Sequence, residues 1–372
     1  MGKTDGWDGF REFRVQKKVF EDLNRDVCSL YLVPTDGGGL PTFKPGQFLT
    51  FRFHMDGPVT GQSRDLIRCY SLSDQPGLGY YRVSVKRVPA PTGSVGVPPG
   101  LASNHIHDVV REGACLPVKA PSGHFFLEEG ESPVVLVAGG IGITPMLSML
   151  NAHFAHGPSR EVWLFYGLRN SAEQVGKAVL ETWSREHPRF HLQVCHSRPL
   201  PGDLHGRDFQ HAGHVDIALL RRTISLQQYR FYLCGPRAMM ESLIPALDAE
   251  GVPEESIHFE SFGPATLVRP VRRSTSSPET AILPRAGHDV TVTFSKSGKR
   301  LPWDEQAGSL LDFAEANGVD VASWCRAGEC GTCETSIQEG EVTYAHSPDF
   351  EPESGHCLLC ISKPKGNLSL DV

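Results

Sequence analysis

The sequence lacks the features that mark secreted, disulfide-rich and nucleic-acid-binding proteins. Its first ten residues contain no apolar run of the kind that a secretion signal needs. Acidic residues outnumber basic ones by 43 to 36, and this net charge of −7 argues against a broad basic face for nucleic acid. Ten cysteines in 372 residues are too few for a disulfide scaffold. We therefore expect a cytoplasmic protein whose cysteines are reduced thiols or metal ligands.

Long apolar runs are also scarce. Residues 133–150 form a stretch of 18 residues without a charge, which is long enough to be considered as a membrane span. Its middle contains Gly139, Gly140, Gly142 and Pro145, which is typical of a strand, a loop and a helix, so we expect no membrane segment here. The G-x-S-x-G, H-E-x-x-H and protein-kinase motifs are absent, and hydrolase chemistry has no support.

What the sequence does contain is unevenly distributed. Half of the ten cysteines lie between Cys325 and Cys360. Residues 288–372 hold 6 basic and 14 acidic residues, a net charge of −8, whereas the preceding 287 residues sum to +1. The C-terminal end is therefore predicted to be a separate acidic, cysteine-rich unit. At about 150 residues per domain, the length agrees with two to three domains.

Patterning divides the chain further. Residues 10–128 show short alternating strands with glycine and proline breaks, which favours a β-barrel or sandwich. In residues 131–263 apolar runs alternate with helical stretches, which predicts a parallel sheet with crossover helices. Residues 264–287 contain four prolines and a serine cluster and are interpreted as a linker. Residues 288–372 begin with a predicted hairpin. Helices are expected at 145–156, 171–187, 214–224 and 237–250, and another between Ser309 as its cap and Gly318 just beyond its end.

Two segments of the β-rich region could bind phosphate. Arg68 lies close to Tyr70 and Ser71, and a guanidinium beside a hydroxyl suits a phosphate while tyrosine offers a flat face to an aromatic ring. Further on, Gly100 followed by Ser103 or Asn104 as N-cap predicts a helix N-terminus, a natural pyrophosphate site. By themselves, such short patterns are more often an ordinary strand and simple helix capping.

The α/β region contains a stronger phosphate signal. A buried strand at residues 134–138 leads into Gly140 and Gly142, after which Thr144 can cap a helix and Pro145 suits its first turn. This is not the G-x-G-x-x-G fingerprint, since Pro145 occupies the place of the third glycine. A tight strand-to-helix connection is the alternative, but glycines at the first βα turn of such a sheet favour phosphate binding.

The C-terminal cysteines have the spacing of a metal site. Cys325, Cys330, Cys333 and Cys360 give C-x4-C-x2-C…C, the plant-type 2Fe–2S pattern. Cys330, Cys333, Cys357 and Cys360 would also fit a two-knuckle zinc site, which would leave Cys325 unused. The cysteine triplet and the hairpin and helix before it favour the iron–sulfur cluster.

Taken together, these segments resemble one known family. The Arg68–Ser71 element, Val85 with Lys86, and the Gly100…Asn104 segment, in this order, are similar to the flavin domain of the ferredoxin–NADP reductase family, especially to the reductase half of flavohaemoglobins. Residues 288–372 resemble plant-type ferredoxins, in which the last ligand is the cysteine of a Leu-x-Cys segment. The resemblance implies an antiparallel β-barrel flavin domain, an α/β parallel-sheet nicotinamide domain and an α+β β-grasp ferredoxin domain.

The resemblance also implies roles for individual residues. In that family the Arg-x-Tyr-Ser element holds the flavin, a Gly…Ser segment holds the pyrophosphate of FAD, and Cys-Gly-Pro lies beside the nicotinamide. The phthalate dioxygenase reductase branch uses FMN with a different segment, so we expect FAD. The residues implied at FAD are Arg68, Tyr70, Ser71, Val85, Lys86, Gly100, Ala102, Ser103, Asn104 and Phe262. Those implied at the coenzyme are Gly140, Gly142, Thr144, Pro145, Ser197, Arg198, Cys234, Gly235 and Pro236. Those implied at the reacting centre are Ser71, Cys234, Glu260 and Phe262. Of these, Phe262 is the residue that would cover the flavin.

The order of these units favours one function. A flavin can take hydride from a nicotinamide and give single electrons to a 2Fe–2S cluster, so we expect a reductase that delivers electrons to an oxygenase component or a hybrid-cluster protein. Ser197 and Arg198 favour NADPH because some relatives use such residues to hold a 2′-phosphate, whereas the likeness to flavohaemoglobins favours NADH, which we expect. Alternatives are a non-catalytic redox sensor and nitric oxide detoxification, the latter disfavoured because no globin segment precedes residue 10 in this sequence.

Overall fold

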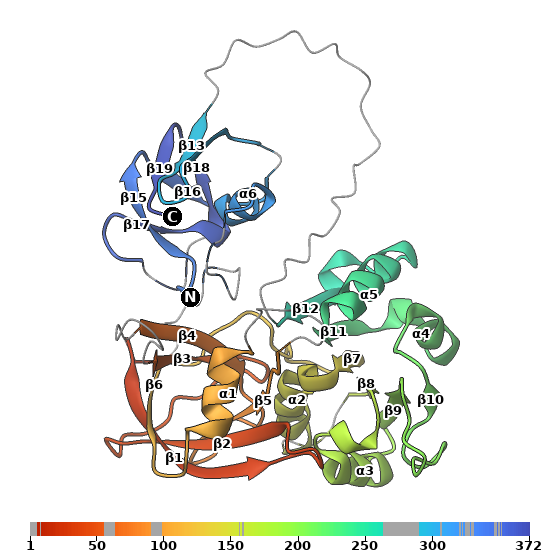
Figure 1. Ribbon diagram of the computed structural model, residues 1–372. Helices are drawn as coiled ribbons and strands as arrows, with labels where there is room; N and C mark the ends of the chain where they lie inside the picture. Colours follow the sequence, from red (N-terminus) through yellow and green to blue (C-terminus); the bar gives the residue numbers. More distant parts are fainter. Residues whose placement is uncertain are drawn as a thin grey trace, which may run out of the picture. The chain divides into compact units, whose positions relative to one another are not determined.

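The computed structural model describes residues 6–7, 9–55, 64–90, 99–155, 157, 160–262, 290–305, 307–319, 331–345 and 352–372, with single residues 321, 323, 328, 348 and 350. Contacts divide the chain into two units, Met1–Ala265 and Thr266–Val372 (Figure 1). The predicted linker, residues 264–287, lies outside the described residues.

The first half of the larger unit is an antiparallel barrel. Its six strands follow the order β4-β3-β6-β1-β2-β5, and every pairing is antiparallel. A bridge between Leu72 and Val83 joins the two ends of this order, which closes the sheet. Phe13, Leu30 and Phe51 fill the interior. The strands are β1 (Arg11–Phe20), β2 (Val27–Pro34), β3 (Phe48–Met55), β4 (Arg64–Ser71), β5 (Tyr81–Lys86) and β6 (Cys115–Val118), and the helix α1 is Leu101–Asp108.

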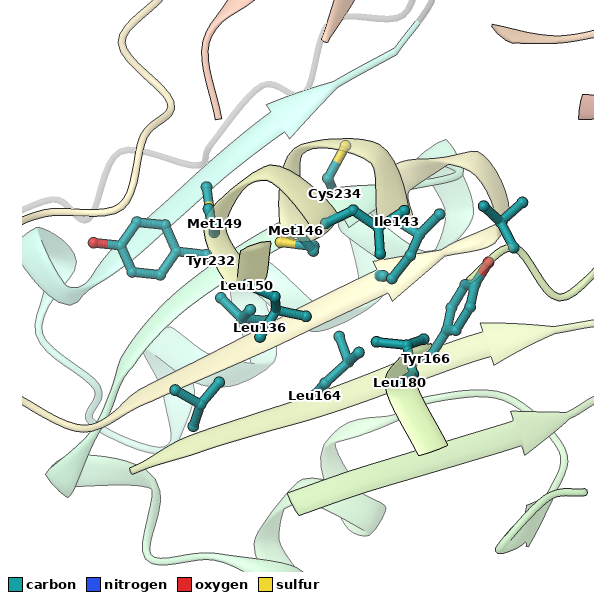
Figure 2. Packing of buried hydrophobic residues seen from close by; sticks show 14 of the residues in the cluster. Leu136, Ile143, Met146, Met149, Leu150, Leu164, Tyr166, Leu180, Tyr232 and Cys234 are labelled. Atoms are coloured by element: carbon teal, nitrogen blue, oxygen red, sulfur yellow. The ribbon is translucent and has the colours of Figure 1, made fainter. Parts of the chain in front are cut away.

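The second half of that unit is a parallel sheet. Its order is β10-β9-β8-β7-β11-β12, and all neighbouring strands are parallel. Strands β8 to β10 are added on one side of β7, and β11 and β12 on its other side, so the strand order reverses between β7 and β11. Figure 2 shows Met146 and Leu150 of α2 beside Leu136 of β7. The strands are β7 (Val134–Gly139), β8 (Val162–Leu168), β9 (Phe190–His196), β10 (His211–Ala212), β11 (Arg230–Gly235) and β12 (Ile257–Ser261). The helices are α2 (Ile143–Ala155), α3 (Lys177–Glu186), α4 (Ile217–Thr223) and α5 (Arg237–Ala249), with 3-10 turns η1 (Gly140–Gly142), η2 (Ser171–Glu173), η3 (Leu226–Gln228) and η4 (Glu254–Ser256).

The smaller unit is built on a mixed sheet. The strand order is β14-β13-β19-β15-β17, in which β13 and β19 run parallel and the other pairs antiparallel. Helix α6 (Leu310–Ala316) begins after Ser309, whose hydroxyl accepts a hydrogen bond from the Asp312 amide at 3.1 Å, and it is followed by Gly318 at φ +65°. The strands are β13 (Thr291–Phe294), β14 (Lys299–Pro302), β15 (Glu334–Glu339), β17 (His356–Leu358) and β19 (Leu368–Leu370), with the pair β16 (Val342–Tyr344) and β18 (Ser362–Pro364) and the turn η5 (Leu359–Ile361).

The predicted fold class is confirmed in all three parts: an antiparallel sheet, a parallel sheet and a mixed α+β sheet. The uncharged run at residues 133–150 forms β7, η1 and α2 rather than one continuous helix. Among the described residues, every helix is too short or too polar to cross a lipid bilayer.

Candidate functional site

The candidate coenzyme site lies where β7 and β11 end side by side. In open α/β sheets, ligands bind beyond the carboxyl ends of the strands at the point where the strand order reverses. Here that edge carries η1 after β7 and the Cys234-Gly235-Pro236 segment at the end of β11. The predicted coenzyme residues of both segments are therefore brought together.

The two segments are in close backbone contact. A methyl group on Gly142 would overlap the Cys234 carbonyl and lie 2.8 Å from the Gly235 amide nitrogen, so no side chain fits there. Gly140 has a φ of +53° and open space around it. This combination of a left-handed backbone and free space at the start of a helix fits the pyrophosphate of a dinucleotide.

Helix α2 begins one residue before the predicted cap. It begins at Ile143, and Thr144 is its second residue, with a hydroxyl that donates to the Ile141 carbonyl at 3.0 Å. The expected capping role of Thr144 is therefore wrong, because that hydroxyl is directed at the preceding turn. Pro145 lies in the first helical turn as predicted, where its missing N–H has no consequence for the helix.

The predicted reacting residues meet across the junction of barrel and sheet. The Ser71 hydroxyl, at the end of β4, donates to Glu260 Oε2 of β12 at 3.1 Å. Burial raises the pKa of Glu260 to about 8, and the hydrogen bond from Ser71 opposes that shift. Cys234 is the register partner of Glu260 on β11 and is fully buried. Burial, reinforced by the Glu260 charge, raises the pKa of the Cys234 thiol well above its ordinary value. Phe262, just after β12, is partly buried against the core of the parallel sheet.

The predicted flavin residues of the barrel are distributed over β4 and β5. Tyr70 packs edge-on against Phe51, with ring centroids 5.7 Å apart, and burial raises the pKa of its hydroxyl. Arg68 donates to the Ile67 carbonyl at 2.7 Å. The Val85 side chain is buried in the barrel core, and Lys86 Nζ lies 3.6 Å from Glu173 Oε2, which belongs to η2 of the parallel-sheet half.

Helix α1 differs from its prediction at the first turn. Gly100 is the N-cap, and neither Ser103 nor Asn104 has that role. Both side chains instead point back, since the Ser103 hydroxyl and the Asn104 amide donate to the Gly100 carbonyl at 3.1 and 2.8 Å. Ala102 is buried against the barrel core. A Cβ on Gly100 would lie 2.8 Å from Ser103 Oγ, so a larger residue would disturb this turn.

A second group of residues follows β8 and β9 on the coenzyme edge. The Ser197 hydroxyl donates to the Leu168 carbonyl at 3.2 Å, while Arg198 is exposed. The sequence interpretation missed Asp203, a buried carboxylate that lies 3.1 Å from His196 Nδ1 and accepts from the Leu200 amide at 3.0 Å. An aspartate in a loop segment of proline, glycine and leucine gives no sequence signal that it folds inward.

Two of the four predicted cluster ligands can be placed. Cys333 and Cys360 are buried in one apolar cluster of the smaller unit, and the Leu359 amide donates to the Cys333 carbonyl at 3.3 Å. Cys325 and Cys330 lie outside the described residues, and within the described ones no group of three metal-ligating side chains occurs. Buried thiols from one loop and from η5 fit a 2Fe–2S cluster, which needs thiolates from both. Cys357 is also buried there, on β17 opposite Thr335.

Two family descriptions match the sequence. Residues 136–243 match the oxidoreductase NAD-binding domain, and residues 292–365 match the 2Fe-2S iron-sulfur cluster binding domain.

Among characterised proteins, the chain is similar to flavohemoproteins. It is 40% identical to that of Bacillus cereus over 268 residues, which are 72% of this chain and 64% of that protein. With the flavohemoprotein of Halalkalibacterium halodurans it shares 38% identity over 261 residues, 70% of this chain and 61% of the other. The chain thus spans less than two thirds of the length of these relatives.

Solved structures extend the similarity to the whole chain. The FAD/NAD-binding domain of nitric oxide dioxygenase from Vibrio cholerae matches 69% of this chain and all of its own length, with 32% identity and a TM-score of 0.58. Phthalate dioxygenase reductase, described as a modular structure for electron transfer from pyridine nucleotides to [2Fe-2S], matches 98% of both chains with 27% identity and a TM-score of 0.55.

Proposed function

The chain belongs to the ferredoxin–NADP reductase family of FAD- and NAD-binding oxidoreductases and carries a C-terminal 2Fe–2S domain, and from this premise we propose that it passes electrons from NAD(P)H to a separate protein. Its cofactors are FAD, a nicotinamide coenzyme and a 2Fe–2S cluster. FAD supplies the conversion between the hydride of the coenzyme and the single electrons that a cluster accepts.

The observation that carries this proposal is the contact between Ser71 and Glu260. It joins the barrel, which holds the predicted flavin residues, to the strand beside Cys234 and the glycine-rich turn. A hydride donor bound at the sheet edge and an acceptor bound on the barrel would meet at this junction. Because its pKa is raised well above the ordinary value, the buried Cys234 thiol stays protonated and adds no charge to the junction. Glu260, with a pKa of about 8, can hold or release a proton there.

We assign the parts of this function to segments of the chain. The flavin part is residues 10–128, the coenzyme part 131–263 and the cluster part 288–372, with 264–287 as the connection. The strand pattern supports these limits, since β1 to β6, β7 to β12 and β13 to β19 fall within the three segments.

The acceptor we propose is an oxygenase component of the Rieske or di-iron type, or a hybrid-cluster protein. The likeness to phthalate dioxygenase reductase over 98% of both chains supports the oxygenase class. The coenzyme we propose is NADH, with the flavohemoprotein likeness in support. Arg198 remains available at the coenzyme edge for a 2′-phosphate, so NADPH is the alternative.

The test is a spectrum of the purified holoprotein before and after anaerobic NADH, with the released flavin identified. We expect FAD, cluster absorbance, and bleaching of both by NADH. Steady-state reduction of cytochrome c then measures transfer to an external protein. Holoprotein that bleaches with NADH but reduces no external protein would leave only the redox-sensor alternative, and absence of bleaching would overturn the proposal.

The same experiment with two variants locates the path. Glu260→Gln alters the junction, and we expect slower flavin reduction by NADH. Cys360→Ser removes a predicted cluster ligand, and we expect flavin reduction to continue while cytochrome c reduction fails. Equal effects on both steps in both variants would contradict the proposed order of cofactors.

A further inference from the structure

Helix α2 has a polar contact with the barrel that involves none of the predicted coenzyme or flavin residues. Ser148 is fully buried, and its hydroxyl donates to the backbone carbonyl of Asp74 at 2.8 Å. Most serines in helices form local hydrogen bonds or face solvent. Here the hydroxyl leaves its own helix and reaches the other half of the unit.

Met149, the next residue of α2, adds an apolar contact with the barrel. A Cβ placed on Gly46 would lie 2.5 Å from the Phe125 carbonyl oxygen and 2.7 Å from Met149 Cε, so a larger residue would crowd both the barrel backbone and this methionine. The Gln47 carbonyl accepts from the Leu72 amide at 2.8 Å. The two barrel segments that contact α2 are therefore hydrogen-bonded to each other.

The acceptor carbonyl is on a well-fixed loop. The Asp74 carboxylate accepts from the Tyr80 hydroxyl at 3.1 Å and lies 3.5 Å from Arg82 Nη1. The Ser73 amide donates to the Arg82 carbonyl at 2.8 Å. A loop held by an ion pair and a backbone bond gives Ser148 a defined position to bind.

The two residues of this hydrogen bond lie in segments that continue into the two sides of the junction, the barrel side and the coenzyme side. Asp74 is three residues beyond Ser71, and Ser148 is five residues beyond Ile143, where α2 begins next to the glycine-rich turn. We propose that Ser148 is a positioning residue: its hydrogen bond to Asp74 fixes α2, and with it the bound coenzyme, relative to the Ser71 end of β4. This inference rests on the proposed function, because it concerns the geometry of hydride transfer.

The expected effect follows from the sensitivity of transfer reactions to distance. Misplacement by about 1 Å far from the chemistry can cost about 100-fold in rate. Met149 still packs in a Ser148→Ala variant, so we expect a smaller displacement and a fall of about tenfold in flavin reduction at saturating NADH. Flavin content is expected to stay at the wild-type level, because neither Ser148 nor Asp74 is a predicted flavin ligand.

The experiment compares Ser148→Ala and Ser148→Cys with Ser29→Ala in the FAD-loaded full chain. Ser29 is an equally buried serine whose hydroxyl lies 2.6 Å from that of Ser84, which in turn lies 2.8 Å from that of Ser73. Ser29→Ala therefore alters the barrel interior behind the same loop and leaves the Ser148 hydrogen bond in place. Stopped-flow reduction by NADH and by its 4-deuterated form gives the hydride step and its isotope effect. Hydrogen–deuterium exchange of residues 72–80 reports the contact independently of activity.

We expect both Ser148 variants to slow the hydride step, to raise the isotope effect and to speed exchange in residues 72–80, whereas Ser29→Ala leaves the hydride step unchanged. Wild-type hydride rates in both Ser148 variants, or equal slowing in Ser29→Ala, would overturn the positioning role. Failure of the wild-type protein itself to accept hydride would instead overturn the proposed function. If Ser148→Ala gives a low yield, the exchange measurement and the isosteric Ser148→Cys variant still test the proposal.

Discussion

The Ser71 hydroxyl donates a hydrogen bond to Glu260 Oε2 at 3.1 Å, and this contact joins two halves that fold around separate cores. Glu260 lies 189 positions further along the chain than Ser71. Because burial raises the pKa of Glu260 to about 8, its carboxyl group is mainly protonated at neutral pH. The junction therefore holds a neutral acid next to the buried Cys234 thiol, and its charge changes within the range of pH used for assays.

This raised pKa predicts a pH-dependent stability. The ordinary pKa of 4.5 applies in the unfolded chain and about 8 in the folded one, so the contribution of protonated Glu260 is complete below about pH 4.5 and is lost as the pH rises through 8. Between about pH 6 and 9 we expect a loss of about 2.5 to 3 kcal/mol of unfolding free energy. Glu260→Gln cannot ionise and should lose less. Urea unfolding at both pH values measures this, with Glu255→Gln, at an exposed position, as the control. Parallel pH profiles in all three proteins would rule the effect out.

Our ligand assignment predicts that replacing Cys360 removes the cluster, whereas replacing the nearby Cys357 does not. Cys360→Ser should lose most of its iron and sulfide, because a 2Fe–2S cluster needs four ligands. Cys357→Ser should keep both, since we assign Cys357 no ligand role. Iron and acid-labile sulfide contents, with the spectrum of the dithionite-reduced protein, decide between the two. Loss of the cluster in Cys357→Ser with retention in Cys360→Ser would reverse the assignment.

The close backbone approach at the coenzyme edge predicts that Gly142 cannot be replaced by a larger residue without a loss of stability. A methyl group on Gly142 would overlap the Cys234 carbonyl, so Gly142→Ala must push β11 and α2 apart. We expect a loss of about 1 to 3 kcal/mol in unfolding free energy and weaker binding of NADH. Gly202→Ala is the matched control, because nothing lies within 4 Å of its Cβ position. Urea unfolding and NADH titration measure the difference, and equal stability of the two variants would contradict the contact.

Arg198 predicts a difference between the two coenzymes. It is exposed next to Ser197, at the edge where a 2′-phosphate would lie. Arg198→Gln should lower kcat/KM for NADPH by about tenfold, the usual scale of one charge-assisted hydrogen bond, and leave that for NADH within about twofold. Arg185→Gln, at an exposed position of α3, should change neither. A fall with both coenzymes would mean that Arg198 does not read the 2′ position.

Local patterns predicted the fold well because each half has its own periodicity and its own core. They were weakest where the deciding contact is made elsewhere in the chain. The helix expected at 171–187 is divided into η2 and α3, because Gly176 takes a left-handed conformation at φ +72°. The caps expected at Ser103, Asn104 and Thr144 were wrong because backbone carbonyls nearby attract their side chains.

The candidate site shows the same limit. The family resemblance could name Ser71, Cys234 and Glu260, since each lies in a short segment that carries the likeness. It could not place Ser148 against Asp74, because a serine within an apolar run has no pattern that identifies a partner 74 positions away. Contacts of this kind depend on how the barrel and the parallel sheet meet within one unit, which no local window contains.

The charge of the smaller unit predicts how electrons leave the chain. Residues 288–372 carry a net charge of −8, while the rest of the chain sums to +1. Six of the described acids of the smaller unit are exposed, namely Asp304, Glu305, Glu315, Glu339, Glu341 and Glu353. Attraction between such a surface and a basic partner speeds encounter at low salt and is screened once the Debye length falls below about 10 Å. We expect the rate constant for reduction of cytochrome c, a basic acceptor, to fall several-fold between about 20 and about 300 mM salt. Ferricyanide, an anion, should show the opposite trend and serves as the control. A rate that is flat with salt for both acceptors would mean that electrons leave the protein away from its acidic surface.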